Sequence, residues 1–262
     1  HAPVARRLFV IGLLLLLMLP SVEAQRKKVG VVLSGGGAKG VAHIGVLQVL
    51  EKAGIPVDVI VGTSMGSIVG GLYAIGYSAD QLDSLVRVQD WMFLLSDKVN
   101  RYDLPFGEKE QDGKYLLSVP FDRGKKRPSG FISGQNVYNL FSDLTIGYHD
   151  SLDFLQLPIP FACVAADMFH REEIVMKGGN LVQAMRASMA IPGVFTPVRT
   201  GNRVLVDGGI LNNFPTDVAR ELGAEIVIGV DVQADLMKED KLESVSGVIP
   251  QVAVVLGVCG GT

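Results

Sequence analysis

Cysteine is scarce in this sequence of 262 residues, which contains only Cys163 and Cys259. Two cysteines cannot build a disulfide framework, although one bridge is open to them in an oxidising compartment. Cys163 lies in the apolar run PFACVAAD, which indicates a small buried side chain rather than a nucleophile or a metal ligand. Stability must therefore come from a hydrophobic core, which a hydrophobic content of 48% can supply.

Histidine is also rare, with four residues at positions 1, 43, 149 and 170. Their spacing matches no metal-binding pattern, so we expect no metal site, and nothing else in the sequence indicates a cofactor. His149 and His170 lie in polar loop sequence, which does not suggest a catalytic base. A metal-dependent or histidine-dependent mechanism is therefore not indicated.

A surface of one charge sign is missing as well. The formal net charge is −3, and both signs are spread along the chain, so there is no basic stripe for a phosphate backbone. We expect no nucleic-acid partner. The short basic run at 125–127 is interpreted first as a solvated loop and second as a contact for anionic headgroups.

One long hydrophobic run stands near the N-terminus, where Arg6 and Arg7 precede the apolar residues 8–19. Twelve residues in a helix span about 18 Å, less than the hydrocarbon core of about 30 Å, so a retained anchor or a buried helix is less favoured than a cleavable signal peptide. We expect residues 1–24 to be removed after Ala24. The mature protein would then work in the periplasm, at the outer membrane or as a secreted protein.

The rest of the chain alternates short apolar strands with amphipathic helices. We expect strands near 28–33, 57–62, 159–168, 172–179, 203–209 and 224–232, and helices near 39–53, 67–76, 78–88, 133–145, 180–193 and 214–223. This order predicts an α/β fold with a mostly parallel sheet and helices on both faces. Reactive residues are then expected where strands end.

Domain organisation follows from the same pattern. Residues 25–235 are treated as one unit, within which 96–130 forms a long irregular excursion. The tail at 236–262 starts as though a further helix were forming, and we expect it to be the beginning of a truncated further region.

A nucleophile motif follows the second strand. Gly62-Thr63-Ser64-Met65-Gly66 matches G-x-S-x-G at a strand-to-helix turn, where glycines allow the close approach that pushes a serine hydroxyl outward. We interpret Ser64 as the nucleophile.

A base for Ser64 is supplied by a carboxylate rather than by histidine. The order Ser…Asp/Glu…His fails because no suitable histidine follows. Asp207, at the end of a strand and followed by Gly208 and Gly209, can accept a proton from the serine if burial raises its pKa.

The glycine-rich stretch SGGGAKG is open to three interpretations. Gly35, Gly37 and Gly40 satisfy G-x-G-x-x-G, but Asp58 precedes its strand instead of ending it, as a ribose-binding acid would. Lys39 does not fit the spacing of a phosphate loop either. The remaining interpretation is a set of backbone N–H groups that hold an oxyanion.

These three motifs, GGGAKG, GTSMG and DGG, resemble those of the patatin-like phospholipase family, and the resemblance extends over about 29–232 through ASMAIPGVFTP and DGGILNNFP. The resemblance implies a three-layer α/β/α fold, a Ser64–Asp207 dyad and metal-free hydrolysis of lipid acyl esters. It also implies an oxyanion hole made by the amides of residues 35–38, namely Gly35, Gly36, Gly37 and Ala38. Lys39 and Gly209 are mild departures, because many members carry Arg and Ala there.

The expected function is therefore a phospholipase A or lysophospholipase type of hydrolase acting on lipid at a membrane surface. The alternatives are an inactive lipid- or nucleotide-binding module and a general esterase or thioesterase. The oligomeric state stays open, with a homodimer among the options. The signal-like segment further resembles secreted or outer-membrane bacterial members.

Several residues around these motifs keep two interpretations. His43 either packs the first helix against the sheet or tunes the loop and Asp207. Asn212 and Asn213 either brace the loop or touch substrate. Methionines 168, 185 and 189 are interpreted as core filler rather than as the lining of an acyl-chain site.

Overall fold

The computed structural model describes residues 26–97 and 130–233. The expected signal peptide at 1–24, almost all of the 96–130 excursion and the tail at 236–262 lie outside the described residues. The two ends of the excursion are linked, because the Asp97 carboxylate accepts hydrogen bonds from the Ser133 amide and hydroxyl at 2.7–2.9 Å.

A seven-stranded sheet forms the centre of the molecule, in the order β11-β1-β2-β5-β10-β9 with β6 paired to β5. Its strands are β1 (Val29–Leu33), β2 (Val59–Thr63), β5 (Phe161–Asp167), β6 (Glu172–Met176), β9 (Val198–Thr200), β10 (Arg203–Asp207) and β11 (Ile226–Val230). The four strands β11, β1, β2 and β5 run parallel to one another. Strands β6 and β10 each pair antiparallel with β5, and β9 pairs antiparallel with β10. The predicted α/β fold with a mostly parallel central sheet is confirmed.

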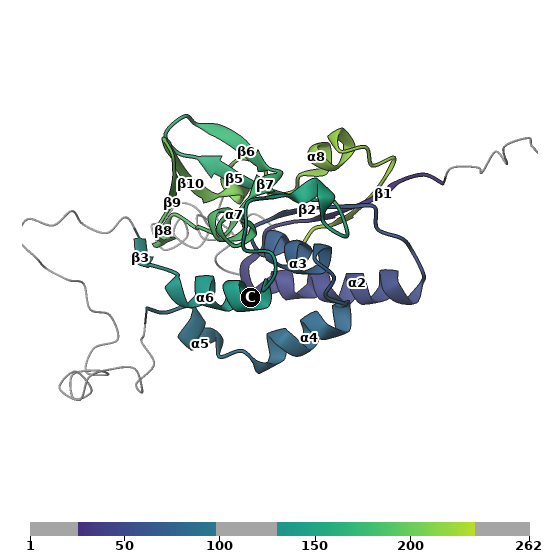
Figure 1. Cartoon of the computed structure of the whole chain (residues 1–262), viewed down its shortest axis with the longest axis horizontal. Helices are drawn as coiled ribbons and strands as arrows, with labels where there is room; N and C mark the ends of the chain where they lie inside the picture. Colours follow the sequence, from purple (N-terminus) through teal and green to yellow (C-terminus); the bar gives the residue numbers. More distant parts are fainter. Residues whose placement is uncertain (1–25, 98–129, 234–262) are drawn as a thin grey trace, which may run out of the picture.

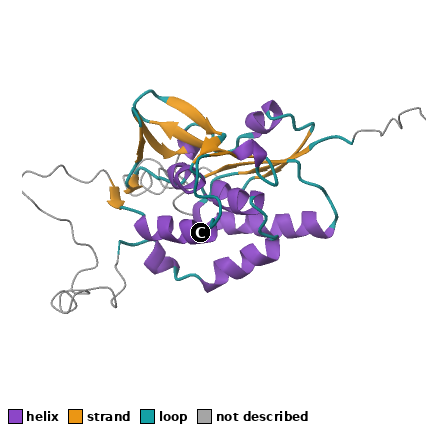
Figure 2. Ribbon diagram, viewed as in Figure 1, coloured by secondary structure: helices purple, strands orange, loops and turns teal. Residues whose placement is uncertain are grey.

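Helices cover both faces of this sheet, as predicted, in a three-layer arrangement (Figures 1 and 2). One face carries α2 (Ala42–Lys52), α3 (Met65–Ala74), α4 (Ala79–Val88), α5 (Trp91–Leu94), α6 (Gln135–Leu144) and α7 (Leu181–Ser188). On the opposite face lies α8 (Thr216–Glu221). Ser78 caps the N-terminus of α4 in a capping box with Gln81.

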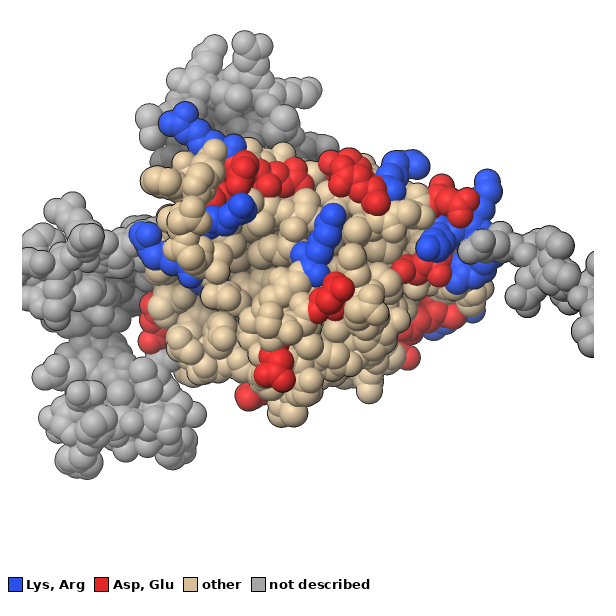
Figure 3. Space-filling model, turned by 45° about the horizontal axis from the view of Figure 1, so that its top comes forward, with Lys and Arg blue, Asp and Glu red and all other residues tan. Residues whose placement is uncertain are grey.

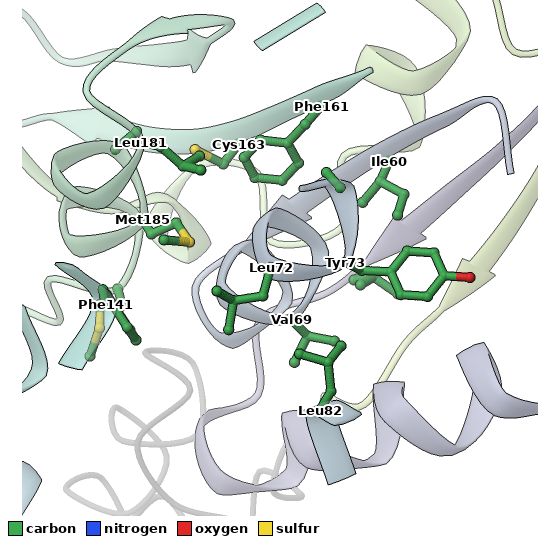
Figure 4. Packing of buried hydrophobic residues seen from close by; sticks show 14 of the residues in the cluster. Ile60, Val69, Leu72, Tyr73, Leu82, Phe141, Phe161, Cys163, Leu181 and Met185 are labelled. Atoms are coloured by element: carbon green, nitrogen blue, oxygen red, sulfur yellow. The ribbon is translucent and has the colours of Figure 1, made fainter. Parts of the chain in front are cut away.

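Strand alternation explains why both faces are buried. In β1, Val31 and Leu33 join the large core beneath α2 and α3, whereas Val32 joins the core beneath α8. In β5, Phe161 and Cys163 likewise face the large core (Figure 4), and Val164 faces the other. Cys163 is fully buried, as its apolar surroundings predict, and its thiol is free.

Strand β5 has three partners along its two edges. Strand β2 pairs with Phe161–Val164, β10 with Ala165–Asp167, and β6 with Cys163–Asp167. Because β6 overlaps both other partners along β5, β6 takes one edge, and β2 and β10 must share the other.

The carboxyl ends of β2 and β10 therefore meet head-on. Thr63 at the end of β2 pairs with Val164, and Asp207 at the end of β10 pairs with the next residue, Ala165. Asp207 lies at the end of its strand, as expected, but this strand is antiparallel to β5 and approaches Ser64 from the opposite direction.

The sequence pattern does not reveal the short elements α5, β9, β3 (Gly130–Ile132), β4 (Leu152–Asp153), η2 (Phe154–Gln156) and β8 (Gly193–Phe195). The strand expected at 172–179 is divided into β6 and β7 (Gly178–Gly179), and the one expected at 203–209 ends at Asp207, before η3 (Gly208–Ile210). The segment η1 (Gly37–Val41) overlaps the start of an expected helix. The helix expected at 39–53 is split into η1 and α2, and α7 ends at Ser188, earlier than expected. The pairing of β3 with β8 depends on contacts between segments that are far apart in the chain, and a short stretch of sequence does not indicate such contacts.

The surface carries mixed charges, as their spread along the sequence predicts. Lys and Arg side chains are interspersed with Asp and Glu side chains on the face shown in Figure 3. Within 26–97 and 130–233, no helix combines the length and apolar character needed to span a bilayer.

Candidate active site

Ser64 occupies a sharp turn between β2 and α3. Its backbone has φ 54° and ψ −123°, a conformation that costs a non-glycine residue about 1–3 kcal/mol. The flanking glycines permit the turn, because a Cβ on Gly62 would collide with the backbone of Gly66, and one on Gly66 with the Leu33 carbonyl. The nucleophile-elbow geometry predicted from GTSMG is therefore present.

Asp207 lies directly against Ser64. The Ser64 Oγ donates to the Asp207 Oδ2 at 2.6 Å, and the Gly209 amide donates to the Asp207 Oδ1 at 2.7 Å. Asp207 is 2% exposed. Burial raises the pKa of Asp207 to about 6, and the hydrogen bonds from Ser64 and Gly209 offset part of that rise.

The last residue of α7 and the segment that follows it hold both members of this pair. The Ser188 hydroxyl accepts a hydrogen bond from the Ser64 amide at 2.9 Å and donates to the Val164 carbonyl at 2.6 Å. The Asp207 amide donates to the Ala190 carbonyl at 2.9 Å. Ser188 lies within ASMAIPGVFTP, but no local pattern indicates its role, because its partner Ser64 is 124 positions away in the chain.

Gly208 follows Asp207 where β10 meets β2. A Cβ on Gly208 would collide with the Val164 carbonyl, and one on Gly209 would crowd the Asn213 side chain. The DGG turn therefore needs its glycines for close approach of the chain to β5.

The glycine-rich loop lies beside Ser64 but its amides differ in their partners. The Gly35 amide donates to the Asn213 carbonyl at 3.2 Å and is thus engaged within the protein, unlike the free donor expected of it. Gly37 and Ala38 are the first residues of η1, so their N–H groups have no acceptor within that helix. Both residues line the same cavity as Ser64.

The other loop residues have structural contacts. A Cβ on Gly36 would crowd Val232, and one on Gly40 would collide with the Met65 side chain. The Lys39 amide donates to the Gly36 carbonyl at 3.2 Å, and the Lys39 side chain is half-buried.

Neighbouring polar residues brace this loop. The Asn213 side chain donates to the Gly35 carbonyl at 3.3 Å, and the Asn212 carbonyl accepts from the Thr63 hydroxyl at 2.9 Å. Of the two interpretations kept for these asparagines, these contacts support bracing. Asp58 precedes β2 and binds Arg26 at 2.6 Å, so the carboxylate that a ribose site would need is used elsewhere.

His43 is fully buried beneath the same loop. Its Nε2 donates to the Ser34 carbonyl at 2.8 Å, which assigns the proton of the neutral ring to Nε2. Burial lowers the pKa of His43 and outweighs the opposing effects of Ser34 and Asp231. These contacts support the packing interpretation, with the ring holding the residue that precedes the glycines.

A family model described as patatin-like phospholipase matches residues 31–220, which is more than half of the chain. The chain belongs to the patatin-like phospholipase family. The match contains all three motifs that predicted the family, and it ends within α8.

Two curated relatives illustrate the sequence similarity of this patatin-like chain. Patatin-like phospholipase domain-containing protein 6 of Homo sapiens is 34% identical over 206 residues, which cover 78% of this chain and 13% of that protein. Lysophospholipase NTE1 of Debaryomyces hansenii is 32% identical over 211 residues, covering 79% and 12% respectively. The chain thus spans only 12–13% of the length of these relatives.

A solved structure shares the fold. The crystal structure of VipD from Legionella pneumophila superimposes with a TM-score of 0.50 at 18% identity, covering 79% of this chain and 50% of that one. At this level of identity the similarity shows the patatin-like fold alone.

An apolar cavity of about 450 Å³ opens beside Ser64 in the patatin-like domain. Apart from the Ser64 hydroxyl and the Trp91 indole, its lining side chains are apolar and come mainly from α3, α5, α6 and the segment after α7. Met185 and Met189 are buried in the core, as expected, and Met189 also lines the cavity. Met168 is 54% exposed, so its interpretation as core filler is wrong. The volume suits an organic ligand.

A second polar group lies at the carboxyl end of β5. Asp167, His170 and Glu172 could each offer a ligand atom to a cation. However, Asp167 already accepts from the Phe169 amide and contacts His170 at 2.6 Å, and Glu172 pairs with Arg203. Although burial opposes it, hydrogen bonding lowers the pKa of Asp167 to about 2. These contacts account for the group without a metal ion.

The buried carboxyl of Asp207 predicts a pH dependence of stability. Its pKa is raised on folding from 3.8 to about 6, so its contribution to stability is complete below pH 3.8 and is lost as pH rises through about 6. We expect Asp207→Asn to gain about 1–3 kcal/mol in unfolding free energy relative to the wild type between about pH 4 and pH 7. Urea denaturation at each pH measures this difference.

Asp150→Asn, which makes the same substitution at an exposed aspartate, is the matched control for this measurement. A wild-type to Asp207→Asn difference that stays constant across this pH range would contradict the raised pKa.

Proposed function

We propose that this patatin-like domain hydrolyses acyl esters of lipids, with Ser64 as nucleophile and Asp207 as proton acceptor. The observation that carries the proposal is the 2.6 Å hydrogen bond from the Ser64 Oγ to a buried carboxylate, beside an apolar cavity. A strained serine, a raised carboxyl pKa and an apolar cavity coincide here, and each suits acyl transfer.

The acylation step uses these groups in order. Asp207 is largely ionised at neutral pH because its pKa is about 6, and it takes the hydroxyl proton as the Ser64 Oγ attacks the ester carbonyl carbon. The C=O π electrons move onto oxygen, which becomes the oxyanion. When the tetrahedral intermediate collapses, the alcohol leaves with the proton from Asp207, and the acyl group stays on Ser64.

The oxyanion is proposed to lie against the glycine-rich loop. Support comes from Gly37 and Ala38, whose amides begin η1 at the wall of the cavity that contains Ser64. Gly36 precedes them and is assigned to the same group. Gly35 is assigned to holding the loop on Asn213 instead, because its amide is already engaged.

Deacylation repeats the chemistry with water. Asp207 takes a proton from a water molecule, the hydroxide oxygen attacks the acyl carbon, and the Ser64 Oγ leaves and regains the proton from Asp207. The fatty acid is released and both residues return to their starting states.

The substrate class follows from the cavity. An apolar enclosure of about 450 Å³ favours a hydrocarbon chain, whose burial is driven by the hydrophobic effect. Members of the family with phospholipase and lysophospholipase names are similar to this chain, which supports a phospholipase A or lysophospholipase type of reaction.

Replacing Ser64 by alanine tests the proposed function. We expect Ser64→Ala to lose at least about 1000-fold in kcat on p-nitrophenyl acyl esters, because the covalent step has no other nucleophile. A fluorophosphonate probe should label the wild type at Ser64 and leave Ser64→Ala unlabelled. The exposed Ser84→Ala on α4 is the control and should label like the wild type.

Undiminished turnover by Ser64→Ala would overturn the proposal. A wild-type protein that binds lipid but resists labelling would favour the inactive binding module.

We also propose that the membrane surface carrying the lipid contacts the α4–α5 corner. Val88, Met92 and Leu95 are exposed there by 75%, 85% and 45%. Trp91 and Leu95 also line the cavity beside Ser64, so apolar surface continues from the outside of the molecule to the nucleophile. A lipid chain leaving a membrane could follow that surface without crossing water.

A charge at this corner tests the proposed contact. We expect Met92→Asp to reduce turnover of phosphatidylcholine vesicles by about tenfold, because an ionised carboxylate resists transfer into the lipid interface. Turnover of a soluble short-chain ester should not change, since Met92 does not line the cavity. Val49→Asp, at a 63% exposed valine on α2, is the matched control. Equal effects of the two variants on vesicles would contradict the assignment.

We propose that the protein is exported from the cytosol, and this proposal rests only on the residues of the N-terminal segment. Two arginines, an apolar run and a small residue at Ala24 support cleavage by a signal peptidase and a site of action outside the cytosol. Intact mass measurement of protein expressed with this segment in a bacterial host should show an N-terminus at Gln25. Retention of residues 1–24 in exported protein would contradict cleavage.

A further inference from the structure

The Ser188 hydroxyl occupies the junction where β2 and β10 meet. Ser188 is fully buried at the end of α7. It accepts from the Ser64 amide at 2.9 Å and donates to the Val164 carbonyl at 2.6 Å. Thr63 is the last residue of β2 to pair with β5, and its partner is Val164. The hydroxyl therefore links β2 to β5 at Ser64, one residue beyond Thr63, where the pairing of these two strands ends.

The two sides of the Ser64 backbone are held unequally. The Ser64 carbonyl accepts from the Ser67 hydroxyl at 2.6 Å and from the amides of Ser67 and Ile68 at 2.9 and 3.3 Å. The Ser64 amide donates to Ser188. Since φ of Ser64 is 54°, the chain relaxes to a more favourable conformation unless its neighbours restrain it. Ser188 supplies that restraint on the amide side.

The same segment also holds the acid. Ala190, two residues beyond Ser188, accepts the Asp207 amide at 2.9 Å. The end of α7 thus contacts the backbones of Ser64 and Asp207 and sets their separation. A side chain that only filled space would need no hydrogen-bond partners, whereas the Ser188 hydroxyl has two.

We infer that Ser188 is a positioning residue for the nucleophile: its hydroxyl fixes the strained Ser64 backbone so that the Ser64 Oγ stays on Asp207. The inference deepens the proposed function and rests on it. It assigns Ser188 no contact with substrate.

Removing the hydroxyl should affect the chemical step more than substrate binding. Ser188→Ala leaves the Ser64 amide and the Val164 carbonyl without this partner. We expect a loss of about 10- to 100-fold in kcat, because small displacements of a reacting group have effects of this size. KM should change by less than about threefold, since Ser188 does not line the cavity. The rate of fluorophosphonate labelling at Ser64 should fall by the same factor as kcat.

Two further variants separate positioning from a general loss of stability. Ser188→Cys keeps a weak donor and acceptor at the same place and should recover part of kcat. Thr145→Val removes another fully buried hydroxyl, which donates to the Phe141 carbonyl at 2.9 Å, and should lower thermal stability without lowering kcat.

The experiment measures kcat, KM, labelling rate and Tm for the four proteins, with active protein counted by titration. Wild-type kcat in Ser188→Ala, or a loss matched by Thr145→Val, would overturn the inference. If Ser188→Ala does not fold, a Ser188→Cys protein whose kcat and labelling rate per titrated site fall below those of the wild type, with KM unchanged, supports the inference, and one with wild-type kcat and labelling rate overturns it. Failure of the proposed function itself would show separately, as turnover that survives Ser64→Ala.

Discussion

The head-on meeting of β2 and β10 along one edge of β5 is the constraint on which the site depends. Two strands that share an edge and approach from opposite directions bring their carboxyl ends onto adjacent rungs, at Val164 and Ala165. Ser64 and Asp207 are 143 residues apart in the chain, yet this arrangement leaves their oxygens 2.6 Å apart. A parallel neighbour would place its carboxyl end beside that of β2 rather than in line with it.

Close backbone approach at this junction explains the glycines around it. Gly62, Gly66 and Gly208 each face a backbone group that a Cβ would strike. None of the three has positive φ, so sterics rather than conformational freedom select glycine there. The backbone strain lies instead at Ser64, which has positive φ. Glycine would tolerate this conformation, but it would lack the nucleophilic hydroxyl.

Two unfavourable features coincide in the site, and the surrounding fold stabilises both. Ser64 has a strained backbone, and Asp207 is a carboxylate taken out of water. The sheet beneath them is buried on both faces, with Val31 and Leu33 in one core and Val32 in the other, so the strands that carry the pair have little room to shift. The end of α7 adds direct hydrogen bonds to both residues.

The sequence alone determined the local features of this protein. The strand, turn and helix around Ser64, the strand end at Asp207 and the buried Cys163 all follow from short-range patterns, because periodicity and glycine spacing are recorded in adjacent residues. It also indicated the family through three motifs. The engagement of the Gly35 amide by Asn213, the role of Ser188 at the junction and the place of Met189 in the cavity wall were decided only by tertiary structure. These depend on which distant segments share an edge or a face, and that choice is made by packing of the whole sheet rather than by any single stretch of residues.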